Sequence, residues 1–195
     1  MKQLGFDLII LGSPASGKDT HADLLMNYYA LKPVKSGEYL RRLRTNPRYK
    51  KVFAQTYDRG LPAPSKIIDD FIKKSVSQAP KGKNLLFVGT PRLLNEAKLL
   101  KKLLDIKKRD FFAIYLKIPD KIVMHRSFHR DREKKDMDVA YIKSRINYHK
   151  KQVQQTVNYF KKFHKLAYVD ANQSIVKVAR AISHTIHAYQ RSKAN

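Results

Sequence analysis

Hydrophobic and polar positions alternate with two different periods along the chain, and together they predict strands that alternate with helices. Short apolar runs bounded by turn residues predict buried strands. These runs cover residues 6–11, 32–36, 84–88, 111–118 and 166–169. Apolar residues spaced three and four apart predict amphipathic helices between them. These helices cover residues 20–30, 38–44, 67–76, 93–104, about 120–130, 138–163 and 175–189. The alternation predicts an α/β fold with helices on both faces of a parallel sheet, and ligands at the carboxyl ends of its strands.

The length and composition of the chain indicate one globular domain. Its 195 residues are 43% hydrophobic, which is enough for a substantial core. No apolar run approaches the roughly 20 residues that span a bilayer. The apolar stretch at 8–11 runs into a glycine loop rather than a cleavage site, so it is interpreted as a strand and not a signal peptide. The chain has no cysteine, which excludes disulfides and thiolate metal sites. We expect a single cytoplasmic domain over 1–195, without membrane attachment.

The charge balance is strongly basic. Lys and Arg total 41 against 16 Asp and Glu, a formal net charge of +25. Such a field attracts nucleotides, nucleic acids or acidic surfaces. Two interpretations stay open: a lysine-rich solvated surface, or a secondary affinity for nucleic acid.

The strongest local signal is a phosphate-binding loop between the first predicted strand and helix. Residues 12–20 read GSPASGKDT, in the strand–loop–helix context that the motif requires. Glycines let backbone N–H groups turn toward phosphates, and the helix N-terminus adds positive charge. Lys18 is expected to reach the β- and γ-phosphate oxygens. The ATP-binding candidates in the loop are Gly12, Ala15, Ser16, Gly17, Lys18, Asp19 and Thr20.

The ending of this motif resembles that of the nucleoside monophosphate kinases. The general form places Ser or Thr directly after the lysine, whereas here Asp19 intervenes before Thr20. A residue-plus-Thr ending is similar to the GxPGxGKGT of those kinases, although Ala15 and Asp19 stand where they typically have glycine. Within this group the resemblance to the adenylate kinase family extends along almost the whole chain.

Several segments resemble the parts of that family that hold the acceptor monophosphate. Residues 36–41, SGEYLR, resemble the segment that opens the small acceptor-binding domain, and 60–64, GLPAP, resemble the loop that lines the base pocket. Residues 89–92, GTPR, resemble the G-F-P-R motif. Carried over residue by residue, the resemblance implies acceptor-binding roles for Ser36, Arg41, Leu61, Ala63, Gly89, Arg92, Glu96 and Arg145.

The resemblance also implies a set of arginines around the transferred phosphoryl group. Arg126 and Arg130 are four apart, share one face of a predicted helix, and match the R-x-x-x-R at the hinge of the lid. Arg145 opens the segment RINYH at 145–149, which resembles R-L-x-x-Y-H with one residue fewer. Phosphoryl transfer needs positioning and charge neutralisation, which converging guanidinium groups supply. The catalytic candidates are Lys18, Arg92, Arg126, Arg130 and Arg145.

The lid expected from the family is short in this chain. It covers residues 130–138, where Arg132 or Lys134 would serve as the further lid cation. On the donor side, the resemblance implies that Arg130 and Gln173 also contact ATP. A helical acceptor-binding insertion is expected at 36–66. The family fold is a three-layer P-loop α/β/α sandwich with a five-stranded parallel sheet in the order 2-3-1-4-5.

Three departures from the family bear on chemistry. Val88 replaces the Asp that normally orders the water shell of Mg²⁺, and Asp19, with Glu38 nearby, is the candidate replacement. Glu96 replaces a glutamine that reads adenine; an ionised carboxylate only accepts hydrogen bonds and suits the two donors of guanine. Ala171 replaces a glycine near the donor base.

These observations predict a monomeric, Mg²⁺-dependent kinase that transfers the γ-phosphoryl of ATP to a nucleoside monophosphate. The resemblance favours AMP, with GMP, UMP or CMP as alternatives. The competing class is a catalytically weak protein that binds nucleotide or RNA on a kinase fold.

Overall fold

The computed structural model describes residues 1–129 and 138–194. Five strands form one sheet in the order β2-β3-β1-β4-β5, and every pair of neighbours is parallel. The strands are β1 (Asp7–Gly12), β2 (Leu31–Lys35), β3 (Asn84–Val88), β4 (Phe111–Lys117) and β5 (Leu166–Asp170). The α/β class and the strand order expected from the sequence are confirmed.

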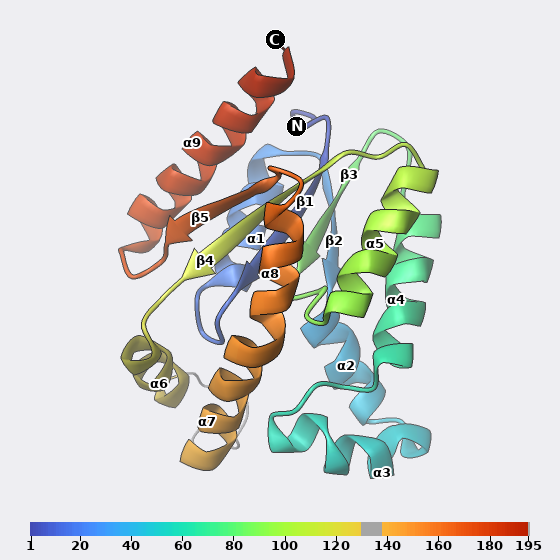
Figure 1. Cartoon of the computed structure of the whole chain (residues 1–195), viewed down its shortest axis with the longest axis vertical. Coiled ribbons are helices and arrows are strands. Elements are labelled where there is room, and N and C mark those ends of the chain that lie inside the picture. Colours follow the sequence, from blue (N-terminus) through green and yellow to red (C-terminus); the bar gives the residue numbers. More distant parts are fainter. Residues whose placement is uncertain (130–137, 195) are drawn as a thin grey trace.

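Helices cover both faces of the sheet and extend beyond its carboxyl edge. Those described are α1 (Lys18–Tyr28), α2 (Ser36–Arg44), α3 (Pro47–Gln55), η1 (Tyr57–Arg59), α4 (Ser65–Ser77), α5 (Leu94–Ile106), α6 (Asp120–Phe128), α7 (Val139–Tyr148), η3 (His149–Val153), α8 (Gln154–Lys161) and α9 (Ile175–Ala194). Figure 1 shows α1 and α9 on one face and α4, α5 and α8 on the other. The same view places α2, α3, α6 and α7 past the carboxyl ends of the strands, and both termini at the opposite end.

Two apolar clusters hold the layers together, one on each face of the sheet. Alternate residues of β1 point to opposite faces, so Leu8 and Ile10 join one cluster while Ile9 and Leu11 join the other. All four side chains are at most 1% exposed. A continuous apolar run is therefore what a central strand covered on both faces requires.

Two differences from the sequence-based prediction concern the helices. Helix α3 was not predicted, and it buries one residue fully, Phe53. The segment predicted as one helix over 138–163 is divided by η3, a π-helical turn at His149–Val153. Such turns occur mostly inside α-helices and frequently at functional sites. This one places His149 at the carboxyl edge of the sheet.

In the described part of the chain, no helix is long and apolar enough to cross a bilayer.

Candidate active site

The loop between β1 and α1 forms a compact turn around the amino group of Lys18. Its Nζ donates to the carbonyl oxygens of Gly12 and Ser13, at 2.8 and 2.7 Å, and to Ser16 Oγ at 3.3 Å. Gly12 is required at its position, because a Cβ there would lie 2.5 Å from the carbonyl oxygen of Leu116. The loop therefore holds a cation at the N-terminus of α1, where anions are favoured.

Ala15 adopts a left-handed backbone conformation, with φ of 55°. A residue with a Cβ is uncommon there, whereas glycine takes this conformation without cost. This backbone conformation gives a physical reason for the glycine that the family pattern has at the position of Ala15.

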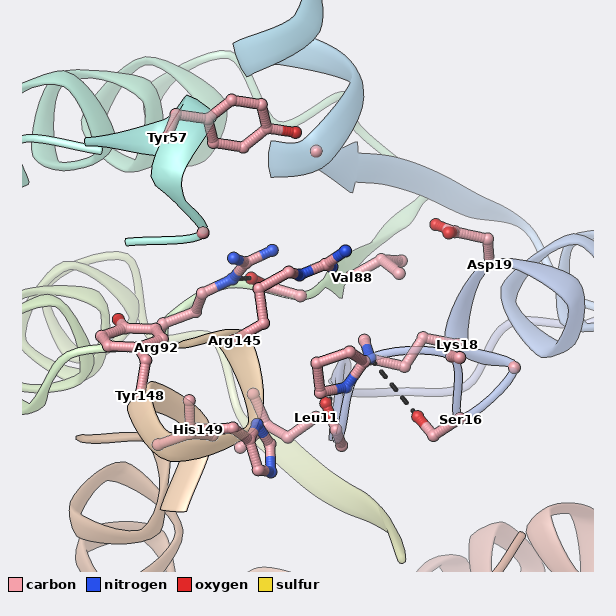
Figure 2. A pocket seen from close by; sticks show the side chains of 18 of the residues that line it. Leu11, Ser16, Lys18, Asp19, Tyr57, Val88, Arg92, Arg145, Tyr148 and His149 are labelled. Atoms are coloured by element: carbon pink, nitrogen blue, oxygen red, sulfur yellow. Dashed lines mark hydrogen bonds between the residues drawn. The ribbon is translucent and has the colours of Figure 1, made fainter. Parts of the chain in front are cut away.

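Three arginines from distant segments line the same cavity as Lys18. Arg41 comes from α2, Arg92 from the loop after β3, and Arg145 from α7. Figure 2 shows the guanidinium groups of Arg92 and Arg145 pointing into one space, across from Lys18. The cavity measures about 110 Å³. Four cations around so small a space favour a phosphate-bearing ligand.

Arg92 is held in place from both ends. Its Nε donates to the carbonyl oxygen of Gly89 at 2.7 Å, and its own carbonyl accepts from Thr156 Oγ1 at 3.0 Å. The remaining guanidinium nitrogens are directed toward the cavity by this arrangement (Figure 2).

Arg145 is positioned by the close approach of α7 to the loop after η1. A Cβ at Gly60 would lie 2.9 Å from the carbonyl oxygen of Tyr141 and 3.0 Å from Cγ of Arg145. Gly60 also has a φ of 75°, so a side chain there is excluded twice. The loop and α7 therefore meet beside the cavity.

His149 forms the floor of the cavity and stays neutral. Its Nε2 is 2.8 Å from the hydroxyl of Tyr115. Burial lowers the pKa of His149 to about 3, and the positive charges of Lys18, Arg92 and Arg145 add to this effect. The ring adds no charge to the cavity at neutral pH, so phosphate binding falls to the lysine and the arginines.

A smaller cavity of about 10 Å³ adjoins the first and contains unpaired polar groups. Among the described residues, the hydroxyls of Thr90 and Tyr148 are buried and lack a hydrogen-bond partner. Ser36 lines the same cavity and donates to the carbonyl oxygen of Gly89 at 3.1 Å. The volume suffices for about one water molecule. A nucleobase would therefore have to widen this cavity, and would meet hydroxyl groups there.

Glu96 lines this smaller cavity and also caps α5. Its Oε2 accepts the backbone N–H groups of Arg92 at 2.7 Å and Leu93 at 3.2 Å. Burial raises the pKa of Glu96, and these two hydrogen bonds oppose the rise. The carboxylate thus bonds to the backbone at the start of α5. Only its other oxygen, Oε1, is available to a ligand.

The remaining acceptor-side candidates are divided between the cavities and the surface. Ala63 is buried and lines the smaller cavity with Gly89, whereas Leu61 is 42% exposed and lines neither cavity. Leu61 was predicted to bind the acceptor because it lies in the GLPAP motif, but the turn of this loop directs its side chain toward solvent.

One carboxylate is suitably placed for a metal ion. Asp19 lines the phosphate cavity beside Lys18, and Val88, which offers no oxygen, lines it as well (Figure 2). Glu38 is exposed on α2 and does not line the cavity. The described residues contain no cluster of three or more metal-binding side chains. Mg²⁺ keeps several waters and binds through one or two carboxylates plus substrate phosphates, so Asp19 fits this ion.

The catalytic candidate Arg126 and the ATP-binding candidates Gln173 and Thr20 lie apart from the phosphate cavity. Arg126 donates to the carbonyl oxygen of Ala171 at 3.2 Å, and Gln173 donates to Asp170 at 3.1 Å. Neither lines the cavity, and Thr20 is exposed outside it. The predicted lid cations lie outside the described residues; they are Arg130, Arg132 and Lys134.

Sequence reasoning assigned no role to several residues that line the phosphate cavity. Tyr148 and His149 fell within the quoted R-x-x-Y-H match, which was the available signal. Tyr57 and Tyr141 carry no such signal, because they reach the cavity through the packing of η1 against α7.

Comparison with known proteins agrees with this geometry. The family model for adenylate kinase matches residues 10–165, well over half of the chain. An adenylate kinase of Synechococcus sp. (strain JA-2-3B'a(2-13)) is 26% identical over 190 residues, covering 95% of this chain and 98% of the relative. Adenylate kinase 1 of Synechocystis sp. is 29% identical over 174 residues, covering 88% and 92%. An adenylate kinase of Methanosarcina acetivorans is 25% identical over 199 residues, covering 87% and 93%. With the sheet order, the phosphate loop and the arginine cluster in agreement, the chain belongs to the adenylate kinase family and is a nucleoside monophosphate phosphotransferase.

Proposed function

We propose that the protein transfers the γ-phosphoryl group of ATP to AMP, forming two molecules of ADP. The observation that carries this proposal is the convergence of Lys18 with Arg41, Arg92 and Arg145 on one cavity. A phosphoryl group in transfer spreads negative charge over its oxygens, and fixed cations around it lower the barrier. The names of the similar proteins support AMP as the acceptor.

The two substrates would approach the cavity from opposite sides. ATP would place its phosphates in the loop around Lys18, with its base toward Arg126 and Gln173. The monophosphate would place its phosphate against Arg41 and Arg92 and its base toward the cavity of Thr90, Tyr148 and Glu96. Arg145 lies between them and would follow the transferred group.

Magnesium is part of the proposed reaction, and Asp19 would hold it. When bound with ATP, the ion neutralises charge on the β- and γ-phosphate oxygens. Asp19 lies in the first turn of α1 next to Lys18, so it would orient the metal relative to the phosphate loop.

A coupled assay for ADP, with ATP and each nucleoside monophosphate in turn, tests the proposal. We expect turnover with AMP that exceeds turnover with the other acceptors. Lys18→Ala should abolish it while the melting temperature stays close to that of the wild type. Lys98→Ala, on the exposed side of α5, is the control and should keep full activity.

Two results would contradict the assignment. Wild-type turnover in Lys18→Ala would remove the phosphate loop from the reaction. Binding of ATP without ADP formation from any monophosphate would favour the alternative of a nucleotide-binding protein without catalysis.

A further inference from the structure

A second cavity lies between α1 and α9. Its volume is about 730 Å³. The N-terminal segment closes one end, where Lys2 pairs with Tyr29 in a single parallel bridge. Figure 1 shows α1 and α9 on the same face of the sheet, with the N-terminus near them. We call this space the α1–α9 groove. Pockets of this size and position are typical of small-molecule sites.

The groove has an apolar floor and an aromatic wall. Leu25 and Ile182 are 7% and 1% exposed and form its base with Leu24. Tyr28 is 71% exposed and stands at its edge. An aromatic side chain left this exposed beside a hollow offers a surface against which a flat ring can pack.

The ionisable side chains that line the groove include cations and histidines but no acid. Lys2 and Arg180 are exposed cations, and His187 lies 3.4 Å from the hydroxyl of Tyr29. Neither cation has an ion-pair partner in the described part of the chain, and no Asp or Glu is among the lining residues. Lys2 and Arg180 therefore have no compensating acid among the residues that line the groove, which favours an anionic ligand.

A buried histidine at the base of the groove lacks a hydrogen-bond partner. His21 lines the groove, is 4% exposed, and its Nδ1 has no partner among the described residues. Burial, and then the charge of Arg126, lower the pKa of His21. An unsatisfied buried polar group is rare in folded proteins and costs free energy, so its presence calls for an explanation.

We propose that the α1–α9 groove binds a small organic anion with a flat aromatic body and one carboxylate or phosphate group. The ring packs between Tyr28 and the apolar floor, the acidic group pairs with Arg180 or Lys2, and a polar atom of the ligand approaches His21. The site is separate from the phosphate cavity, since no residue lines both. It does not depend on the proposed kinase reaction.

The groove is connected to the phosphate loop through His21. A Cβ at Gly17 would lie 3.4 and 3.5 Å from two atoms of the His21 ring, so this ring packs against the loop from the groove side. A ligand that contacts His21 therefore contacts the side chain that supports the loop.

Isothermal titration calorimetry with 1-naphthoate and 1-naphthyl phosphate tests the proposal. Saturating Mg²⁺ and ATP keep the ligands out of the phosphate cavity, and neutral 1-naphthalenemethanol is the uncharged comparison. We expect one-to-one binding of at least one anion, and binding of the neutral alcohol at least about tenfold weaker. Charged hydrogen bonds contribute enough to account for such a ratio.

Matched variants on α9 locate the binding. Arg180→Gln should weaken anion binding about tenfold or more, while Arg191→Gln, which removes an exposed cation outside the groove, should not. Ser183→Trp should fill the groove and abolish binding, and Ala188→Trp on the outer surface of α9 should leave it unchanged. A circular dichroism spectrum and a melting temperature close to those of the wild type show that the tryptophan variants fold.

Three results would overturn the proposal. They are the absence of binding by both anions, equal binding of the neutral alcohol, and binding to Ser183→Trp with wild-type affinity. Each is distinct from a failure of the kinase assignment, which is measured with ATP and monophosphates alone.

Discussion

At the scale of single residues, the carboxylate that lines the phosphate cavity is Asp19. The resemblance to the family led us to expect a carboxylate at the end of β3 instead, where this chain has Val88. Asp19 lies in the first turn of α1 and Val88 at the end of β3, and both line the cavity. Val88 is 3% exposed and packs in an apolar cluster, and its side chain has no oxygen that could bind the water molecules around a metal ion. Asp19 is therefore the carboxylate that we propose for Mg²⁺.

This assignment predicts a compensating pair of substitutions. Asp19→Gly should lower kcat about 10–100-fold, as loss of metal-orienting groups typically does. Adding Val88→Asp should restore part of that loss and reduce the Mg²⁺ concentration needed for half-maximal rate. Asp23→Ala, on the exposed face of the same helix, should have no effect. An Asp19→Gly enzyme faster than wild type would instead show that the carboxylate repels phosphate.

Glu96 gives a second prediction at the residue scale, concerning the acceptor base. Facing adenine, Oε1 finds a donor only at N6 and is repelled by the lone pair of N1, whereas facing guanine it finds a donor at N1 and at N2. An unpaired buried polar group costs about 1–3 kcal/mol, roughly a factor of 5 to 150. Glu96→Gln should therefore raise kcat/KM for AMP relative to GMP by a factor in this range.

The capping role of Glu96 provides the control for this measurement. In Glu96→Gln the amide oxygen can still accept from Arg92 and Leu93, so the melting temperature should change little. Glu96→Ala removes the cap and should cost about 1 kcal/mol of unfolding free energy. An unchanged ratio of AMP to GMP efficiency in Glu96→Gln would remove this residue from the base pocket.

At the scale of elements, one aspartate links β4, β5 and α9. Asp110, directly before β4, bonds to Lys165 at 2.5 Å and Lys193 at 2.6 Å and accepts from the Tyr189 hydroxyl at 3.0 Å. Burial alone would raise the pKa of Asp110, but the three hydrogen bonds lower it to about 2. The ionised carboxylate therefore holds the C-terminal helix against the sheet.

This linkage predicts how stability depends on pH. An unfolded Asp titrates near 3.9, so the contribution is complete above about pH 4 and is lost as pH falls through about 2. Asp110→Asn should lower the free energy of unfolding at neutral pH by about 1–2 kcal/mol, after allowance for solvent screening. Denaturant melts at successive pH values should show this difference shrinking below pH 4. Asp105→Asn, in an exposed pair with Lys101, is the control and should change stability by less than about 0.5 kcal/mol.

The elements predicted best from the sequence are those whose hydrophobic pattern fits only one kind of secondary structure. The strand at Asn84–Val88 was predicted with its bounds, because a short apolar run between turn residues leaves little alternative. Helix α3 was missed because its nine residues give only a short apolar stripe, although Asn46 caps its N-terminus and Pro47 begins it, a recognisable start signal. The π-helical turn was missed because apolar spacing continues through it and does not report a shift in hydrogen bonding.

The candidate site was predictable to the extent that its residues lie in local motifs. Lys18, Arg92 and Arg145 were selected from three separate segments, and the structure brings them to one cavity. The cap made by Glu96 was missed because the residue before the helix, Leu93, offers no side-chain oxygen that would mark a capping box. The α1–α9 groove had no sequence signal, because it arises from the packing of helices 150 residues apart.

At the scale of the whole molecule, the net charge of +25 acts on every anionic ligand. Lysines cover surfaces well away from the cavity, including the exposed positions Lys98 and Lys102 on α5 and Lys107 directly after it. Single exposed charges interact weakly with a distant ligand in salt, but their summed field raises the local concentration of anions. The phosphate cavity lies inside this field and benefits from it at low ionic strength.

This field predicts a specific salt dependence of catalysis. KM for ATP and for the monophosphate should rise as KCl increases from about 20 to 300 mM, while kcat stays nearly constant. The Debye length falls from roughly 20 Å to under 10 Å over this range, which weakens the long-range attraction of the substrates but not the chemical step. The triple variant Lys98→Glu, Lys102→Glu and Lys107→Glu should raise both KM values at low salt and match the wild type at high salt. If the triple variant and the wild type have equal KM values at 20 mM KCl, attraction is confined to the cationic groups of the cavity, and the basic surface then serves no role in substrate binding.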